Sequence, residues 1–269
     1  MLVLKFGGTS VASAKNISLV KVIVQEKKGS CITIVSAFSG ITNLLIECSE
    51  KAAQGDQTYL NLLHKIETQH LKTTTDLISV KVQGKTLSKV KILLNELEDI
   101  LRGVFLIHEL SPKTSDRIVG FGETLSSLII NDYFQDAGMK SKLADPKEFI
   151  KTDNHYGKAN VDFIVSKKKI KNYFREEGVW VSLGFIASNQ KNEPTTLGRG
   201  GSDYTAAIIA AALRSERLEI WTDVSGMMTA NPRLVRSAYP IKQISYDEAM
   251  ELSHFGAKVI YPPTIQPTL

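Results

Sequence analysis

The sequence predicts an α/β protein, a three-layer αβα sandwich in which a mainly parallel central sheet lies between layers of helices. Short apolar runs rich in β-branched residues recur along the chain, and each is followed by Gly, Ser, Thr or Asp. Segments with helical periodicity lie between these runs. Strand, turn and helix in alternation are typical of this architecture. A chain of 269 residues with 43% hydrophobic residues is also long and apolar enough to bury a full core.

Four apolar runs carry the predicted sheet. Each is too short for a typical helix and is bounded by turn residues, as expected of strands that are buried on both faces. The predicted strands are 2–6, 31–35, 179–185 and 218–221.

Helical periodicity fills most of the remaining chain. The pattern is wholly helical from 58 to 108, which predicts an inserted helical layer or lid rather than another β–α unit. Turn residues mix with charge from 145 to 173, and Lys167-Lys168-Lys169 in this stretch is predicted to be a solvated helix face. No repeat or linker divides the chain, so we expect one domain of two lobes. The predicted helices are 14–28, 42–53, 57–73, 86–108, 115–137, 202–214 and 246–255.

Composition excludes several classes of protein. The formal charge of +5 is modest for 33 basic and 28 acidic residues, so it is weak support for binding nucleic acid. Cys31 and Cys48 are far apart and no His cluster has metal-ligand spacing, which excludes structural zinc. The N-terminus lacks a signal-peptide pattern, and no apolar stretch reaches membrane-spanning length. We therefore expect a cytoplasmic protein with no membrane or nucleic-acid partner.

A glycine pair follows the first predicted strand, in Lys5-Phe6-Gly7-Gly8-Thr9-Ser10. Glycines let the backbone approach phosphate oxygens closely, and the helix that follows offers free N–H groups and the positive end of its dipole. The lysine adds a full charge. The sequence is not a Walker A motif, and no dinucleotide fingerprint occurs in the chain. This segment is either a phosphate-binding loop or an ordinary tight turn.

Two further motifs place polar groups where predicted helices begin. In the segment 36–43 the hydroxyls of Ser36 and Thr42 can cap a helix or hold a ligand. In 120–126, Glu123 lies between glycines and a strongly apolar helix. Burying this acid is costly unless a cation such as Lys5 or a substrate ammonium meets it.

A fourth motif, 197–203, places Arg199 among three glycines just before a predicted helix. The glycines form a backbone concavity, and a guanidinium inside it is a planar, bidentate partner for a carboxylate. Asp203 lies in the first helical turn, where negative charge is favoured. A purely structural loop rarely needs an arginine between glycines, so we interpret this segment as a binding loop.

A fifth motif, 221–233, follows a strand and turns sharply, in the position where open α/β sheets bind nucleotides. Near the C-terminus, Phe255-Gly256-Ala257-Lys258 places a second lysine after a helical pattern. By itself Lys258 is best explained as a surface lysine.

In this order the motifs resemble the aspartate kinases of the amino-acid kinase family, whose fold is the carbamate kinase-like sandwich. The resemblance covers essentially the whole chain. Through the segment 245–253, the chain most resembles the kinase portion of bifunctional aspartokinase–homoserine dehydrogenases. It rests on KFGGTSV, SAFSGITN, GETLSS, GFIAS, TTLGRGGSDYTA, WTDVSG, NPR and FGAKV.

The resemblance implies transfer of the ATP γ-phosphoryl group to the β-carboxylate of L-aspartate with Mg²⁺, giving 4-phospho-L-aspartate. This is the first step of lysine, threonine and methionine biosynthesis. It also implies that an N-terminal lobe of about 1–190 binds aspartate and a C-terminal lobe of about 191–269 binds ATP. Positioning and charge should dominate such a reaction, because the carboxylate is itself the nucleophile.

Matching each motif position carries the family's roles onto this chain. No protein side chain is expected to be a dedicated metal ligand. The implied catalytic residues are Lys5, Asp203 and Lys258. The implied substrate-binding residues are Ser36, Thr42, Glu123, Phe185, Arg199 and Ser202. The implied nucleotide-binding residues are Lys5, Gly7, Gly8, Ser10, Thr222, Asp223, Met228, Arg233 and Lys258.

The chain departs from the family pattern mainly on the nucleotide side. Met228 stands where a tyrosine is usual, and Asn231 replaces the usual acid before Pro-Arg. The family's regulatory domains, and the dehydrogenase of its bifunctional members, have no counterpart in these residues. We therefore expect a piece of a longer parent protein that is a homo-oligomer.

Two other functions stay open. Another amino-acid kinase, acting on glutamate, acetylglutamate, carbamate or UMP, would use the Lys5 loop equally well, although Arg199 and Glu123 favour aspartate. A non-catalytic amino-acid-sensing module would explain the altered nucleotide loop. The presence of Lys5, Arg199, Asp203 and Lys258 argues for an active kinase.

Overall fold

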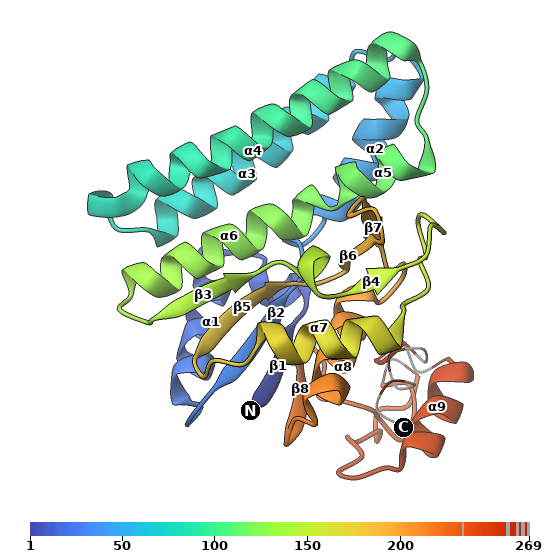
Figure 1. The fold of residues 1–269 in the computed structure, drawn as a ribbon. Coiled ribbons are helices and arrows are strands. Elements are labelled where there is room, and N and C mark those ends of the chain that lie inside the picture. Colours follow the sequence, from blue (N-terminus) through green and yellow to red (C-terminus); the bar gives the residue numbers. More distant parts are fainter. Residues whose placement is uncertain (233, 257–258, 262–263, 265–266, 268–269) are drawn as a thin grey trace.

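A five-stranded parallel sheet forms the centre of the molecule (Figure 1). The computed structural model describes residues 1–232, 234–256, 259–261, 264 and 267. The strand order is β3-β5-β2-β1-β8, and every neighbouring pair is parallel. The predicted mainly parallel sheet is therefore confirmed. Its strands are β1 (Leu2–Phe6), β2 (Cys31–Val35), β3 (Ser141–Ala144), β5 (Val179–Leu183) and β8 (Arg217–Trp221).

Both faces of the inner strands β1, β2 and β5 are buried, which explains why these strands are apolar runs. In β1, Leu2, Leu4 and Phe6 belong to one hydrophobic cluster, whereas Val3 belongs to the cluster on the opposite face. Successive side chains of a strand point to opposite faces. Lys5 is therefore directed to the same face as Val3.

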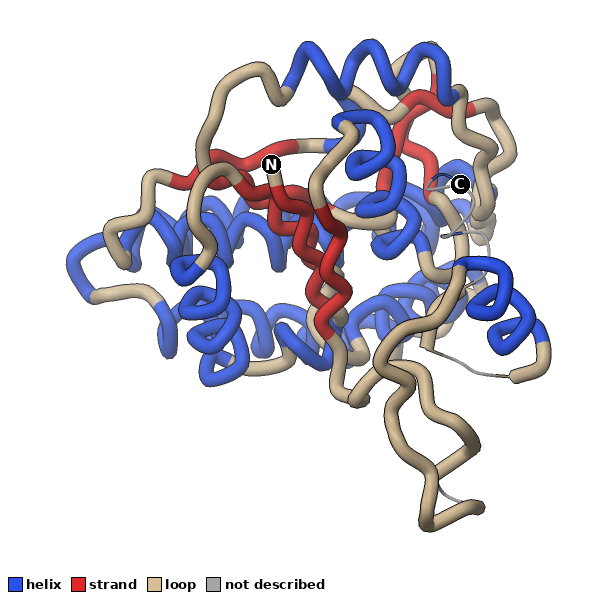
Figure 2. The backbone as a smooth tube through the Cα atoms, turned by 90° about the horizontal axis from the view of Figure 1, so that it is seen from below, coloured by secondary structure: helices blue, strands red, loops and turns tan. Residues whose placement is uncertain are grey.

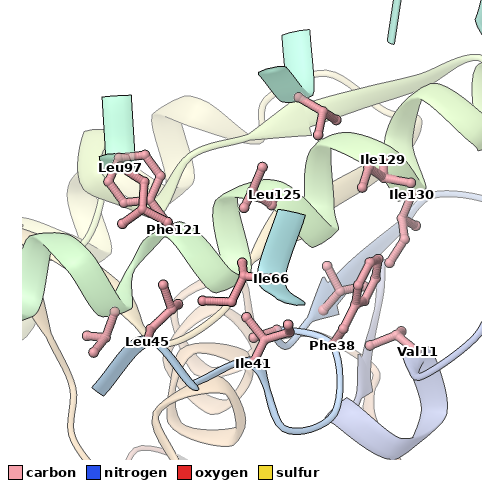
Figure 3. Close-up of a cluster of buried hydrophobic side chains, with 14 of the residues drawn as sticks. Val11, Phe38, Ile41, Leu45, Ile66, Leu97, Phe121, Leu125, Ile129 and Ile130 are labelled. Atoms are coloured by element: carbon pink, nitrogen blue, oxygen red, sulfur yellow. The ribbon is translucent and has the colours of Figure 1, made fainter. Parts of the chain in front are cut away.

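The first cluster joins the sheet to a thick helical layer. It combines α1 (Ala14–Glu26), α2 (Ile41–Ala53) and α6 (Phe121–Asp136) with the long pair α3 (Tyr59–Leu77) and α4 (Val80–Ile107). Figure 1 shows this pair lying over α6, and Figure 3 shows the apolar side chains between them. The helical layer predicted between 58 and 108 is confirmed, and it packs directly on the core.

The opposite face is covered by α7 (Phe163–Tyr173) and α8 (Gly201–Leu213). Lys167, Lys168 and Lys169 are exposed on α7, so the predicted solvated helix face is confirmed. The helix α8 begins at the C-terminal edge of the sheet, close to the end of β1.

Three parts of the architecture differ from the sequence-based expectation. A second, three-stranded sheet was not predicted; its order is β4-β6-β7, with β6 and β7 antiparallel. Its strands, β4 (Lys151–Thr152), β6 (Ile186–Asn189) and β7 (Pro194–Thr196), are too short to give a periodic signal. The edge strand β3 was missed because two of its four residues are exposed.

The single helix predicted over 115–137 is wrong, because the structure has two helices there, α5 (Pro112–Val119) and α6. They meet at Gly120, where a Cβ would lie 3.3 Å from both the Asp116 carbonyl oxygen and the Ile186 side chain. This crowding favours glycine at the junction. Two short 3₁₀ helices, η1 (Gly8–Val11) and η2 (Pro146–Glu148), complete the connections.

A long loop leaves the sheet after β8 and leads to α9 (Tyr246–His254), which begins with a capping box formed by Ser245 and Glu248. Figure 2 shows this loop extending away from the body of the molecule. Since β8 pairs with β1, the predicted N-terminal and C-terminal lobes share one sheet. None of the helices in the described residues is long and apolar enough to cross a membrane.

Candidate active site

A cavity of about 740 Å³ opens where β1, β2 and β5 end and α8 begins. All six predicted substrate-binding residues line it, together with Lys5, Gly8 and Asp203. These residues come from segments separated by up to about two hundred positions in the chain. The fold therefore brings four of the five sequence motifs to one place. The six are Ser36, Thr42, Glu123, Phe185, Arg199 and Ser202.

The cavity floor holds an ion pair between Lys5 and Asp203, whose Nζ and Oδ1 atoms are 2.6 Å apart. Lys5 is the fourth residue of β1, and its place in the strand directs it to the face covered by α8. Asp203 lies in the first turn of α8, where the helix dipole favours an acid. The lysine is only 9% exposed, so its charge is held in place at the cavity surface.

Glu123 is a second acidic residue in the cavity lining. This side chain lies in the first turn of α6 and is buried, and its Oε1 accepts a hydrogen bond of 3.2 Å from the Ala37 N–H. Its Oε2 has no hydrogen-bond partner among the described residues. Burial raises the pKa of the carboxyl to about 7, although the Ala37 N–H and the charge of Lys5 act in the opposite direction.

The sequence left two cations as candidates to meet Glu123, namely Lys5 and a substrate ammonium. Lys5 forms its ion pair with Asp203. One buried carboxylate oxygen of this cavity-lining residue is therefore unpaired, and the ammonium of a ligand is a suitable partner for it.

The Arg199 loop forms the outer rim. Gly198 and Gly200 both have left-handed backbone conformations, with φ of 72° and 69°, and Gly200 is the N-cap of α8. A Cβ on Gly200 would lie 2.8 Å from Tyr261, so this position needs glycine on both counts. Arg199 itself is exposed, and its guanidinium has no ion-pair partner in the part of the chain that the structure describes. It is available to a ligand carboxylate.

Phe185 connects the end of β5 to the start of α8. It is one of the non-glycine residues with positive φ, at 68°, and its N–H donates to Thr205 Oγ1 at 3.0 Å. The preceding Gly184 allows a close approach, because a Cβ there would lie 2.6 Å from the Ser202 side chain. These contacts fix Phe185 and Ser202 relative to each other. Backbone strain of this kind persists only where the surroundings enforce it.

The predicted nucleotide-binding residues are only partly brought together. Ser10, Thr222 and Asp223 line a neighbouring cavity of about 240 Å³ beside Trp221. Gly7 lies next to the Lys5 ammonium, since a Cβ on this glycine would be 3.5 Å from Nζ.

Met228 pairs with Pro240 in an isolated β-bridge. A further cavity of about 410 Å³ is lined by its neighbour Met227, together with Trp221 and Thr222. The predicted residues Arg233 and Lys258 lie outside the described residues.

The structure adds lining residues that the sequence did not indicate. Gly157 reaches the cavity from the charged, turn-rich stretch after β4. Its only sequence signal was the turn-forming composition of that stretch. Phe38, which lies in the 36–43 motif but had no predicted role, also lines the cavity and stacks on the buried His70 of α3, with ring centroids 5.0 Å apart. This contact joins the helical layer to the site, and no local sequence pattern predicts it.

The chain belongs to the amino acid kinase family, whose profile matches residues 1–268. Among the relatives, it is 33% identical to the chloroplastic bifunctional aspartokinase/homoserine dehydrogenase 1 of Arabidopsis thaliana, over 98% of this chain and 30% of that protein. It is 33% identical to the lysine-sensitive aspartokinase 3 of Escherichia coli, over 100% of this chain and 59% of that protein. The chain thus spans between about a third and three fifths of the length of these relatives.

Solved structures give the same result for the fold. The E. coli aspartokinase III in complex with aspartate and ADP superposes with a TM-score of 0.90 at 32% identity, covering 99% of this chain and 59% of that one. The aspartate kinase of Clostridium acetobutylicum superposes with a TM-score of 0.81 at 28% identity, covering 99% of this chain and 57% of that one.

Proposed function

We propose that this chain is the catalytic part of an aspartate kinase, which transfers the γ-phosphoryl group of ATP to the β-carboxylate of L-aspartate. The observation that carries the proposal is the charge arrangement of one cavity. Arg199 on the rim, the free Oε2 of Glu123 on one wall and Lys5 on the floor match the three charged groups of aspartate. The similarity to an aspartokinase solved with aspartate and ADP supports it.

In this proposal each charged group of the substrate has one protein partner. Arg199 binds the α-carboxylate through its planar guanidinium. Glu123 accepts from the α-ammonium, which lowers the pKa of the carboxyl from its raised value. The β-carboxylate is then directed toward Lys5. Ser36, Thr42 and Ser202 provide polar groups, and Phe185 closes one side of the cavity.

The reaction requires positioning and charge neutralisation more than proton transfer. The β-carboxylate oxygen forms a bond to the γ-phosphorus while the bond to the β,γ-bridging oxygen breaks, and ADP leaves. Lys5 lies beside the glycine pair Gly7-Gly8 and stabilises negative charge on the transferring group. Asp203 holds the lysine in place through the 2.6 Å ion pair.

The ATP phosphates would lie between the glycine pair and the segment after β8, where Ser10, Thr222 and Asp223 line a cavity. Mg²⁺ in kinases is bound by one or two carboxylates together with the phosphates of the nucleotide. In the described residues no three metal-binding side chains cluster, and Asp203 is the carboxylate next to the phosphate loop. This donor set fits a magnesium ion that arrives with ATP and neutralises charge on its phosphates. The contributions of Met228, Arg233 and Lys258 to nucleotide binding remain part of the proposal.

We also propose a biological setting for this reaction. We place it at the first step of lysine, threonine and methionine biosynthesis, in the cytoplasm, in a homo-oligomer. The named relatives include both aspartokinases and bifunctional aspartokinase/homoserine dehydrogenases, which supports a role in amino-acid biosynthesis.

An ADP-release assay across candidate acceptors tests the proposal. We expect turnover with L-aspartate and little with glutamate, acetylglutamate, carbamate or UMP. Turnover of one of these others, with none for aspartate, would contradict it. Aspartate binding in a calorimeter without any ATP binding would instead support an amino-acid sensor.

A further inference from the structure

Asp116 is a buried acid with no part in the proposed chemistry. It lies on α5 and is 3% exposed, and it does not line the 740 Å³ cavity. It lies seven residues before Glu123, on the other side of the helix break at Gly120. A carboxylate in this position loses its hydration and needs specific partners to compensate.

Those partners are two segments of the second sheet region. The Gly157 N–H lies 2.9 and 3.0 Å from the two carboxylate oxygens. The Thr196 N–H donates to Oδ2 at 2.9 Å, and the Thr196 hydroxyl donates to Oδ1 at 2.9 Å. No lysine or arginine in the described residues forms an ion pair with this carboxylate. The acid is therefore held by neutral donors of one loop residue, Gly157, and one strand residue, Thr196.

Both segments belong to the wall of the cavity. Gly157 lines it directly. Thr196 is the last residue of β7, three residues before Arg199, and its carbonyl accepts a hydrogen bond of 2.9 Å from the Ala159 N–H. A Cβ on Gly198 would lie 3.2 Å from the Gly157 carbonyl oxygen, so the two segments are packed against each other. The Asp116 side chain bonds both Gly157 and Thr196 without lining the cavity itself.

We propose that Asp116 is a positioning residue for aspartate binding, which acts by fixing the start of the Arg199 loop against Gly157. The inference rests on the proposed function of the cavity. One side of the start of this loop is already fixed, because the Phe185 carbonyl accepts from the Leu197 N–H at 2.9 Å and the Phe185 N–H donates to Thr205 of α8. Asp116 supplies the anchor on the remaining side.

The chemistry of the site requires a carboxylate rather than an amide. A carboxylate has only acceptors, and both of its oxygens face N–H or O–H donors here. The Asp116→Asn substitution keeps the shape but places an NH₂ group opposite at least one backbone N–H. Two donors then face each other in a buried position, and the segment must shift to relieve them.

Kinetics of D116N against a matched control test the proposal. Asp132→Asn is the control, because Asp132 is also a buried acid, but it bonds Thr86 and Lys89 of α4, away from the cavity. We expect D116N to raise the aspartate KM about tenfold or more while the ATP KM changes less than about threefold. D132N should lower Tm without changing the aspartate KM. An unchanged aspartate KM in a folded D116N would overturn the proposal.

Hydrogen exchange gives a second readout that needs no turnover. The amides of 197–203 should exchange faster in D116N than in the wild type or in D132N. Equal exchange in all three proteins would refute the anchoring role even if activity were lost. If the wild type turned over a different acceptor, the proposed function would fail, while this measurement would still decide the role of Asp116.

The Thr196→Val substitution provides a milder variant in case D116N does not fold. It removes the hydroxyl donor and keeps the backbone N–H, the size and the β-branch. We expect a smaller rise in the aspartate KM, about threefold, with faster exchange in 197–203. Wild-type values for both would count against the proposal.

Discussion

Lys5 Nζ lies 2.6 Å from Asp203 Oδ1, which joins the end of β1 to the first turn of α8 across 198 positions of sequence. The pair fixes the charge that the proposed reaction needs at the phosphoryl group. Because Lys5 is only 9% exposed, its ammonium cannot move far from this position.

Replacement of Lys5 by alanine should lower kcat about 100- to 1000-fold, as expected when a group that stabilises transition-state charge is removed. The aspartate KM should change less than about threefold. Steady-state kinetics with ADP release as the signal measure both. Lys89→Ala is the control, since Lys89 forms a comparable ion pair with the buried Asp132 between α4 and α6, away from the cavity. Retention of full kcat in K5A would exclude Lys5 from the chemistry.

Replacement of Arg199 by alanine should instead raise the aspartate KM, by about 30- to 100-fold, because a charge-assisted bidentate contact is lost. The kcat at saturating aspartate should fall much less. Arg199→Lys should recover only part of the affinity, since lysine keeps the charge but not the planar fork. Arg175→Ala is the control; this arginine follows α7 and donates to Asn172 of that helix, outside the cavity. An aspartate KM unaffected by R199A would remove the assigned carboxylate site.

Aspartate binding should depend on pH through Glu123. Burial raises the pKa of its carboxyl to about 7 in the free protein, so the carboxylate form increases as pH rises from 6 to 8. Only that form makes a charge-assisted hydrogen bond with an ammonium. The aspartate KM should therefore fall about tenfold over this range. Measurement of KM at each pH in the wild type and in Glu123→Gln tests this, since the variant should be weak and flat across the range. A pH-independent wild type would contradict the assignment.

His70 should make the folded state sensitive to acid. It is fully buried, Nδ1 lies 2.7 Å from the Ile66 carbonyl oxygen, and Nε2 has no hydrogen-bond partner in the described structure. Burial lowers the pKa of the imidazole to about 4. Between this value and the unfolded value near 6.5, the unfolded state binds more protons, so stability falls as pH falls.

The predicted loss for His70 is about 2 kcal/mol in the free energy of unfolding between pH 7 and pH 5. Urea unfolding at both pH values measures it. In His70→Phe the stack with Phe38 is kept and the titrating group is removed, so the loss should be smaller by this amount. An equal loss in both proteins would show that His70 does not titrate as proposed.

Local patterns were sufficient where burial on both faces or a long helical period left a strong signal. The buried strands β1, β2 and β5 were predicted from short apolar runs, and the helical layer of α3 and α4 from its period. The edge strand β8 was predicted from its apolar run although none of its residues is buried. The second sheet was not predicted, because β4 has only two residues and β7 has three, which is too short for a periodic pattern. Its strands are held by pairing with distant neighbours, such as Lys151 with Ser188, which no local window contains.

The same division applies to the site. Arg199 among glycines and Glu123 at a helix start are informative by themselves, because each residue type is costly or unusual in its local setting. The pairing of Lys5 with Asp203, and the unpaired Oε2 of Glu123, are relationships between elements. Asp116 is the extreme case, because its sequence context is an ordinary amphipathic helix and its role appears only through Gly157 and Thr196.

The sequence by itself determined the α/β class, the glycine loops and the residue types of the cavity, since these depend on backbone freedom, periodicity and charge within a few positions. Only the tertiary structure decided that Lys5 pairs with Asp203, that Glu123 keeps a free oxygen, and that Asp116 anchors the Arg199 loop. The physical reason is distance. Electrostatics and hydrogen bonds act over a few ångströms, and which groups come within that range is set by the parallel register of the sheet and the packing of α5, α6 and α8 around its end.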